Sequence, residues 1–142
     1  MKAVVQRVAR ASAEPGGAIA AGVCVLLGVA DGDDEGVAIR LAVKVGRLRI
    51  FENDEGRFER SLLDTGGSAL VVSQFTLIAD TAKGNRPSFS GAARPEVAEP
   101  LYIAFADALR AVGVHVETGV FGARMAVELV NDGPVTIILE HG

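Results

Sequence analysis

The apolar residues of this chain fall into short runs, and glycine stands at most of the breaks between them. The chain contains 17 glycines in 142 residues, a larger share than the roughly 7% of an average protein. The longest apolar run covers residues 23–30, well short of the about 20 residues that cross a bilayer. The pattern therefore predicts many short elements joined by turns, folded as one domain over residues 1–142 without a membrane span.

Composition and charge limit the class of protein. Hydrophobic residues make up 49% and charged residues 23%, which supplies enough apolar surface for a globular core. The net charge of −4 leaves no general excess of lysine and arginine, so it argues against a protein that coats nucleic acid. A local basic patch and a nucleic-acid substrate both stay compatible with this charge.

The start of the chain and its single cysteine indicate the compartment. Gln6 and Arg7 interrupt the apolar start, and no apolar segment typical of a signal peptide follows. Cys24 has no partner for an internal disulfide and lies between Val23 and Val25, so we expect a buried, reduced thiol. The expected location is the cytoplasm.

Strands are predicted to outnumber helices. The pattern predicts strands at residues 2–8, 23–29, 49–51, 69–77, 114–117, 121–130 and 135–140. Turns or loops are predicted at residues 11–20, 53–56, 61–68 and 81–93, and long loops such as the last one are often functional. Because the final strands follow one another closely, we expect a mixed or antiparallel sheet and not a doubly wound one.

Two helices are predicted. The first follows the N-cap cluster Asp31-Gly-Asp-Asp, and the second begins near Pro95 and ends before Gly113. Their apolar stripes are Val37, Leu41, Val45 and Leu48 in the first, and Val97, Leu101, Phe105, Ala108 and Val112 in the second. Pro100 interrupts the second stripe, and we expect it at the end of a loose first turn, because deeper in a helix it would remove a hydrogen bond.

Familiar catalytic groups are scarce. The two histidines are His115 in a predicted strand and His141 beside the C-terminus, and neither has a Cys or His partner at metal-ligand spacing. A Ser-His-Asp triad would have to recruit one of them, and no glycine loop of the P-loop or dinucleotide type occurs. We therefore expect neither a metal site nor an organic cofactor.

Two motifs place polar side chains at predicted strand ends. The first is Ser73-Gln74-Phe75-Thr76, and the second is Asn131-Asp132-Gly133-Pro134-Val135-Thr136. Together with Lys83-Gly-Asn-Arg-Pro-Ser-Phe-Ser and Gln6-Arg7-Val8, they resemble the D-aminoacyl-tRNA deacylase family, in the right order and over nearly the whole chain. The resemblance implies a homodimeric hydrolase that cleaves the ester between a D-amino acid, or glycine, and the 3′ acceptor end of tRNA.

The resemblance also implies a fold and a site. The expected fold is α/β, a single domain with a mixed or antiparallel, curved, barrel-like sheet and two main helices. The expected catalytic residues are Ser73, Gln74, Phe75 and Thr76, and those expected in substrate binding and chiral selection are Arg7, Lys83, Arg86, Ser88, Phe89, Asn131, Gly133 and Pro134. The chain departs from the family pattern at residues 13–20, which look shorter, at Arg57-Phe-Glu-Arg, where the family often has Met-Asn, and at Pro100.

The first motif suggests how an ester could be activated. In a strand, Gln74 and Thr76 would share one face, and backbone N–H groups beyond the last strand pair can point at a developing oxyanion. The alternative is that these polar residues only finish a strand. Thr76 is a candidate nucleophile, but the sequence supplies no base for it, so we favour activation of water by the 2′-hydroxyl of the terminal ribose.

The second motif suggests how chirality could be read. A Gly-Pro bond can be cis at modest cost, and the family resemblance implies a cis Gly133–Pro134 bond that reaches into the partner subunit's site. Its carbonyl oxygens would leave room for hydrogen but not for a side chain at the substrate α-carbon, which excludes L-amino acids. Without the resemblance, a trans turn joining two strands would be the simpler interpretation.

The irregular loop carries the remaining candidates. Lys83, Arg86 and Arg94 form a small basic set that suits the tRNA acceptor end, although each also suits solvated surface charge. Ser88 and Phe89 either form a pocket wall or anchor the loop. Two other function classes stay open, a nucleic-acid-binding accessory protein without hydrolysis and a dimeric small-molecule-binding domain. The sequence does not indicate which D-amino acids or tRNAs are preferred.

Overall fold

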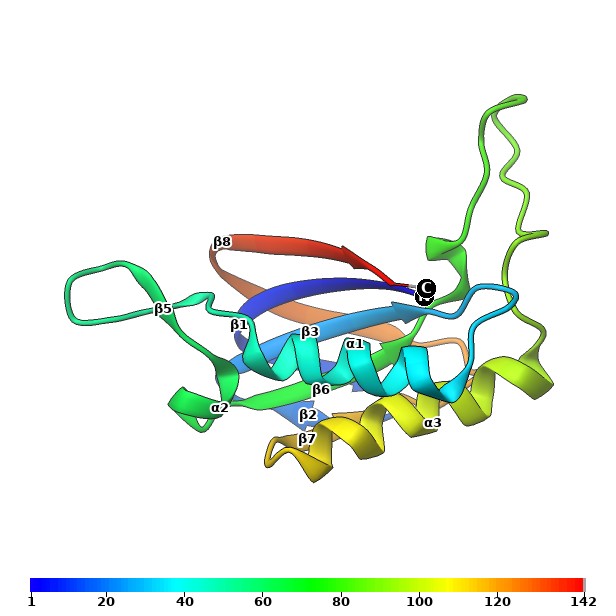
Figure 1. Ribbon diagram of the computed structural model, residues 1–142. Coiled ribbons are helices and arrows are strands. Elements are labelled where there is room, and N and C mark those ends of the chain that lie inside the picture. Colours follow the sequence, from blue (N-terminus) through cyan, green and yellow to red (C-terminus); the bar gives the residue numbers. More distant parts are fainter. Residues whose placement is uncertain (142) are drawn as a thin grey trace.

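A six-stranded mixed sheet organises the chain in the order β2-β1-β3-β6-β7, with β8 beside β1 (Figure 1). The structure, a computed structural model, describes residues 1–141. The strands of this sheet are β1 (Lys2–Glu14), β2 (Ala18–Ile19), β3 (Gly22–Gly28), β6 (Ser68–Ser73), β7 (His115–Thr118) and β8 (Ala126–Glu140). β3, β6 and β7 run parallel, whereas β1 is antiparallel to β2, β3 and β8. The mixed sheet expected from the sequence is confirmed.

Two helices, α1 (Glu35–Arg47) and α3 (Pro95–Ala111), pack against each other on one face of the sheet (Figure 1). α1 begins where Asp34 Oδ1 accepts a hydrogen bond from the backbone N–H of Val37, at 2.9 Å. α3 begins with Pro95, whose missing N–H needs no partner in the first turn of a helix. Both main helices therefore lie where the sequence predicts them.

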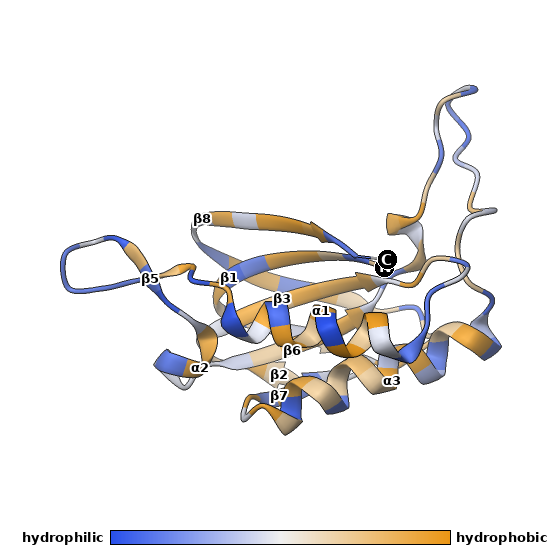
Figure 2. Ribbon diagram, in the orientation of Figure 1, coloured by the Kyte–Doolittle hydropathy of each residue, from blue (hydrophilic) through white to orange (hydrophobic). Residues whose placement is uncertain are grey.

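Buried apolar side chains lie on both faces of β3 and β6, which are apolar along most of their length (Figure 2). Toward the helices, Val25 of β3 belongs to a cluster with Leu41 of α1 and Phe105 of α3. On the opposite face, Cys24 of β3 belongs to a second cluster with Leu70 of β6. Burial raises the pKa of the Cys24 thiol to about 11, so this cysteine stays protonated at neutral pH.

β1 and β8 are long strands that bend together and curl the sheet toward a barrel (Figure 1). Their register shifts between Gln6 and Val8 and again between Val8 and Arg10. Bulges of this kind bend a strand and increase its twist. Consequently the first half of β1 pairs with β3, while its second half pairs with β2, where Ala11 lies opposite Ile19. The curved, barrel-like sheet is confirmed.

Several predicted strand boundaries are wrong. Residues 11–14, predicted as part of a turn, continue β1. The strand predicted at residues 69–77 ends at Ser73, and a 3-10 turn, η1 (Phe75–Leu77), follows it. The strands predicted at residues 121–130 and 135–140 are one strand, β8, preceded by a turn. The limits are set by pairing with distant strands, which a local residue pattern does not contain.

The segment after α1 also differs from expectation. β4 (Phe51–Glu52) and β5 (Phe58–Arg60) form a hairpin around the predicted turn, so the strand starts later than residue 49. The loop predicted at residues 61–68 contains a short helix, α2 (Leu62–Thr65). It forms because Ser61 and Asp64 cap each other's backbone N–H groups, which also lowers the pKa of the Asp64 carboxyl.

The helix α3 is rotated relative to its predicted stripe. Val97 is exposed, and the buried positions are Ala98, Leu101, Tyr102, Phe105, Ala106 and Leu109. Packing against α1 sets this rotation, which the sequence period leaves undetermined by about one residue. Pro100 lies inside the helix and not in its first turn.

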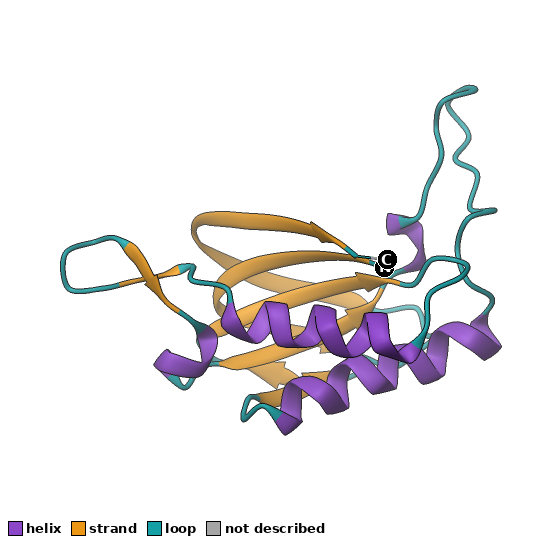
Figure 3. Cartoon of the chain, in the orientation of Figure 1, coloured by secondary structure: helices purple, strands orange, loops and turns teal. Residues whose placement is uncertain are grey.

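Residues 78–94 form a long excursion beyond η1 that projects away from the sheet (Figure 3). Bridges between Asp80 and Ser88 and between Ala30 and Ala92 hold its base. The irregular loop predicted at residues 81–93 is confirmed. Within residues 1–141, no helix combines the length and the apolar character needed to cross a membrane.

We expect replacement of Phe105 by alanine to lower the free energy of unfolding by about 3–5 kcal/mol, because the ring is fully buried between α3 and the sheet. Urea denaturation followed by circular dichroism measures the loss. Ile103→Ala on the same helix is the control, since Ile103 is 49% exposed and should cost at most about 1 kcal/mol. Equal losses for the two variants would contradict the packing described above.

Candidate active site

A cavity of about 490 Å³ opens where β6 ends. Its lining comes from the end of β6 and η1, the base of the long excursion, the start of α3 and the turn before β8. The lining residues are Val29, Ser73, Gln74, Phe75, Thr76, Phe89, Ala92, Ala93, Pro95, Ala98, Phe121, Gly122, Ala123 and Met125. Most of these side chains are apolar, and none of them is an acid or a base. The cavity can therefore bind and orient a ligand, but its own side chains offer no group that titrates near neutral pH.

The four residues of the first motif all reach this cavity. The backbone N–H of Gln74 donates a hydrogen bond to the carbonyl of Leu27, at 2.8 Å. After this bond the chain leaves the sheet and turns into η1. The alternating faces predicted for a strand are therefore wrong here. Instead, the turn brings Gln74 Nε2 to 3.2 Å from Thr76 Oγ1, so the amide donates to the hydroxyl.

Two backbone N–H groups follow Gln74 at the start of η1. Within residues 1–141, the N–H groups of Phe75 and Thr76 have no hydrogen-bond acceptor in the protein. The first N–H groups of any helical turn lack an acceptor inside that turn. These two groups are therefore available to a negatively charged oxygen bound beside the motif.

Aromatic rings form one wall of the cavity. The rings of Phe75 and Phe89 meet edge to face, with centroids 5.2 Å apart and planes at 76°. The excursion that carries Phe89 is tied back to the sheet by the N–H of Ala93, which donates to the carbonyl of Val29 at 3.0 Å. Phe121, on another wall, lies 5.9 Å from the ring of Tyr102. These contacts connect the cavity to the core.

Four loop residues that the sequence proposes for the site do not line this cavity. Ser88 is paired with Asp80 through two backbone hydrogen bonds and borders a neighbouring groove of about 620 Å³. Lys83 and Arg86 are exposed farther along the excursion. Arg94 is exposed and lies 3.1 Å from the carboxylate of Glu96. The excursion itself therefore separates Phe89, which reaches the cavity, from the basic residues.

Neither histidine lies in the cavity. His115 pairs with Ser68 at the start of β6, which is the opposite end from Ser73, and its Nε2 lies 2.6 Å from Glu117. His141 borders the neighbouring groove, where its Nε2 accepts a hydrogen bond from Arg40 at 3.0 Å. Residues 1–141 contain no cluster of three or more His, Cys, Asp or Glu side chains placed to hold a metal ion.

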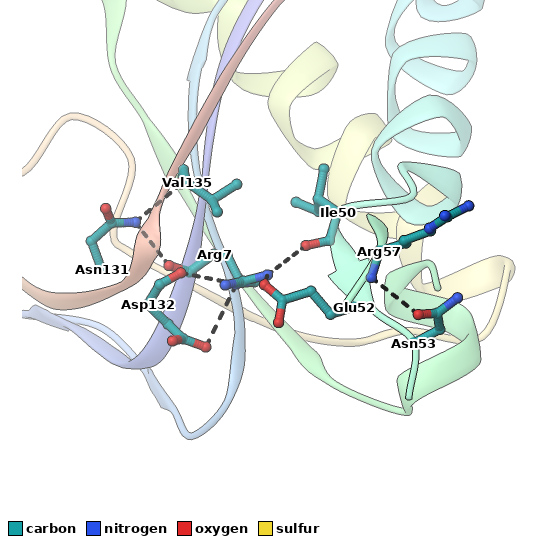
Figure 4. Close-up of polar contacts among 8 residues, drawn as sticks. All are labelled: Arg7, Ile50, Glu52, Asn53, Arg57, Asn131, Asp132 and Val135. Atoms are coloured by element: carbon teal, nitrogen blue, oxygen red, sulfur yellow. Dashed lines mark hydrogen bonds and ion pairs between the residues drawn. The ribbon is translucent and has the colours of Figure 1, made fainter. Parts of the chain in front are cut away.

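Arg7 is a buried cation that forms a hydrogen bond and an ion pair with Asp132 of the second motif (Figure 4). Its Nε donates to the carbonyl of Asp132 at 2.9 Å, and its Nη1 donates to the carbonyl of Ile50 at 2.9 Å. Carboxylate oxygens of Glu52 and Asp132 lie 3.3 Å and 3.6 Å away. The guanidinium also lies over the ring of Phe58, 5.7 Å from its centroid. Arg7 thus joins β1 to the β8 bulge and to the β4–β5 hairpin.

Asn131 fixes the same turn from the other side (Figure 4). Its Nδ2 donates to the carbonyl of Arg7 at 2.9 Å and to the carbonyl of Val135 at 3.0 Å. The Gly133–Pro134 peptide bond between these contacts is cis, and so is Glu14–Pro15. Arg7 and Asn131, both predicted to bind substrate, hold the backbone on either side of Gly133 and Pro134 through Asp132 and Val135.

The two motifs lie at opposite ends of the sheet. Arg7 pairs with Val23, and Val23 pairs with Ala69 near the start of β6. Ser73 pairs with Leu27 at the far end of β3. With about 3.3 Å per residue along a strand, four residues of β6 and the width of the intervening strands separate the turn from the cavity. Within one chain, therefore, the Gly133–Pro134 turn does not reach the Ser73 end.

Some cavity residues are absent from the sequence prediction. Phe121, Gly122, Ala123 and Met125 line the cavity from the turn before β8, and Pro95 and Ala98 line it from α3. Residues 121–125 were assigned to a strand, and no motif marks them as part of a site. The parallel pairing of β7 with β6, in which Thr118 lies opposite Val71, brings the chain after β7 to the end of β6 where η1 begins.

The chain is similar to known proteins over nearly its whole length. The chain matches the family described as D-Tyr-tRNA(Tyr) deacylase over residues 4–140. A D-aminoacyl-tRNA deacylase of Roseiflexus sp. (strain RS-1) is 61% identical over 144 aligned positions, which cover 99% of this chain and 93% of the relative. A D-aminoacyl-tRNA deacylase of Deinococcus radiodurans is 54% identical, with 99% of each chain covered.

Solved structures resemble the chain as well. The protein named c-Myc DNA Unwinding Element Binding Protein superposes with a TM-score of 0.91 at 43% identity, covering 99% of this chain and 98% of its own. A probable eukaryotic D-amino acid tRNA deacylase, at 18% identity, shares the fold with a TM-score of 0.81, with 97% of each chain covered. These matches place the chain among the deacylases, which are hydrolases. Within that class, it belongs to the D-aminoacyl-tRNA deacylase family.

We expect Arg7→Lys to destabilise the fold by roughly 2 kcal/mol, because a lysine cannot donate to both carbonyls in the geometry of a guanidinium. Thermal and urea unfolding measure the change. Arg10→Lys is the matched control on the same strand, since Arg10 is 63% exposed and makes only a surface contact with Glu128. A loss of stability as small for Arg7→Lys as for Arg10→Lys would show that the hydrogen bonds of Arg7 contribute little to the free energy of unfolding.

Proposed function

We propose that the 490 Å³ cavity hydrolyses the ester of D-aminoacyl-tRNA, and also that of glycyl-tRNA. One observation carries the proposal: the cavity joins Ser73, Gln74 and Thr76 and two available backbone N–H groups to apolar walls without any acid or base. Hydrolysis of an ester is accelerated when the protein holds the ester in place and stabilises the negative charge that develops on its carbonyl oxygen. Such a site needs a substrate that brings its own proton-transfer group.

The terminal ribose of tRNA carries such a group. Water adds to the ester carbonyl carbon, and the N–H groups of Phe75 and Thr76 stabilise the negative charge that develops on the carbonyl oxygen. The bond from that carbon to the ribose 3′-oxygen then breaks. The neighbouring 2′-hydroxyl relays the proton from water to the departing 3′-oxygen. The products are the free amino acid and tRNA with its 3′-hydroxyl restored.

Chiral selection is assigned to the Gly133–Pro134 turn of a partner subunit. The turn lies too far from the Ser73 end to act within its own chain, so it serves a homodimer in which each turn enters the other cavity. Within residues 1–141, β8 pairs with β1 alone, and it exposes Val127, Val130 and Ile138, which is apolar surface for a second copy. Carbonyl oxygens of the turn would face the substrate α-carbon, where a hydrogen fits and a side chain does not.

The acceptor end is held at the mouth of the cavity. Lys83 and Arg86 on the excursion, with Arg94 at its end, supply positive charge for the terminal phosphates. The edge-to-face pair of Phe75 and Phe89 offers an apolar surface in the cavity itself, while Ser88 stiffens the excursion. The cytoplasm, where aminoacyl-tRNA is used, is the proposed location.

The wild-type protein should release D-tyrosine from D-tyrosyl-tRNA and glycine from glycyl-tRNA, and should leave L-tyrosyl-tRNA intact. Gly133→Ala should lower the ratio of D to L hydrolysis by about tenfold or more, because φ at Gly133 is +153° and a Cβ would lie 2.6 Å from Val135 N. Deacylation of matched labelled tRNAs measures both. Gly84→Ala is the control, because φ is +151° there and no heavy atom lies within 4 Å of the added Cβ. Equal hydrolysis of D- and L-tyrosyl-tRNA by the wild type would contradict the proposed role of Gly133 and Pro134 in chiral selection.

A second experiment separates the substrate hydroxyl from Thr76. Thr76→Ala should keep kcat within about tenfold of the wild type, since only one hydrogen bond to Gln74 is lost. A D-aminoacyl-tRNA ending in 2′-deoxyadenosine, with the amino acid on the 3′-oxygen, should react at least about 100-fold more slowly. Single-turnover hydrolysis with both substrates distinguishes the two groups. Full activity on the deoxy substrate, with none left in a folded Thr76→Ala variant, would instead make Thr76 the nucleophile.

A further inference from the structure

Four cations follow one another between residues 40 and 49 without an intervening acid: Arg40, Lys44, Arg47 and Arg49. The whole chain has 14 lysines and arginines against 18 acidic residues. Positive charge is therefore concentrated on one short segment of an acidic protein. The proposed cavity and turn do not use this segment.

The structure gathers these cations on one exposed surface, which we call the α1 basic face. Arg40, Lys44 and Arg47 follow the i, i+4, i+7 spacing of one helix side, and Arg49 lies just beyond the end of α1. All four line a shallow groove of about 500 Å³. At 1.5 Å rise per residue, the three helical cations span about 10 Å, which is less than two phosphate intervals of an extended strand.

Most of this charge is not neutralised by the protein. Within residues 1–141, Lys44 and Arg47 have no ion pair. The Nε of Arg40 is bound to the imidazole of His141, and Arg49 lies 3.9 Å from the exposed carboxylate of Glu59. Cations in the last turn favour the helix dipole, which explains Lys44 and Arg47 but neither Arg40 nor Arg49.

One end of the α1 basic face, at Arg49, lies near the second motif. The carbonyl of Ile50, the residue after Arg49, accepts a hydrogen bond from Arg7, and Arg7 holds the turn at Asp132. If that turn enters the partner's cavity, the α1 basic face lies beside the rim of the same cavity. A nucleic acid whose 3′ end occupied the cavity would then pass close to these four side chains.

We infer that the α1 basic face binds the phosphodiester backbone of the acceptor arm of the aminoacyl-tRNA substrate. The inference rests on the proposed function and adds a second contact, outside the cavity, between enzyme and tRNA. Arginine and lysine bind phosphates by charge-assisted hydrogen bonds and by release of condensed counterions, so the contact strengthens binding without reading sequence.

The test uses the full chain with Lys44→Gln and Arg47→Gln combined. KM for full-length D-aminoacyl-tRNA should rise about tenfold or more near 0.1 M salt, while kcat stays unchanged, and the slope of log KM against log salt should fall by roughly 1.5 for two lost phosphate contacts. Arg10→Gln with Arg60→Gln is the control of equal charge change, because both side chains are exposed and paired with surface acids. Circular dichroism melting verifies that each variant is folded.

A short substrate separates this inference from the proposed function. A D-aminoacyl ester of the trinucleotide CCA lacks the acceptor stem, so the wild type and the Lys44/Arg47 variant should hydrolyse it with equal kcat/KM. An unchanged KM for full-length tRNA in that variant, with the short ester still hydrolysed, would overturn the inference and leave the deacylase function intact. Failure of the wild type on both substrates would defeat the function itself. Tighter binding of the α1 basic face to duplex DNA than to a tRNA acceptor minihelix would also overturn the inference.

Discussion

The buried guanidinium of Arg7 joins three segments that are far apart in the sequence. It donates to carbonyls of Asp132 in β8 and Ile50 before β4, and it lies over the ring of Phe58 in β5. A buried charge must be hydrogen-bonded and balanced, so these segments have one favourable mutual arrangement. The shape of the Gly133–Pro134 turn is consequently set by the interior of the protein. The same contact positions the hairpin and, next to it, the end of the α1 basic face.

The cavity at the other end of the sheet has the opposite character. Its lining has no acid or base, and its polar groups are an amide, two hydroxyls and backbone N–H groups. Polar groups fixed in apolar surroundings interact strongly with a developing charge and need little reorganisation. In the proposed function, the two ends of the molecule therefore have different roles. The cavity at one end stabilises the reacting ester. The Gly133–Pro134 turn at the other end enters the partner's cavity and excludes L-amino acids there.

The sequence predicts well where strong local signals exist. The helices α1 and α3 follow from capping residues and a 3.6-residue period, and the long irregular loop follows from its glycine, serine and proline. The sequence singles out Ser73, Gln74, Phe75 and Thr76 as site candidates, and all four line the cavity. The alternation assumed for them fails, because β6 stops where its neighbour β3 stops offering hydrogen-bond partners. A residue pattern does not contain the length of a neighbouring strand.

By itself, the sequence determined the family, the two helices, the mixed sheet and the residues of the first motif, because each depends on local periodicity or on contiguous residues. Only the tertiary structure decided that Arg7 and Asn131 hold a turn, that Phe121 and Met125 complete the cavity, and that the two motifs lie apart. These facts depend on strand register and on hydrogen bonds between residues more than a hundred positions apart. Such contacts form only when burial of the whole core selects one register.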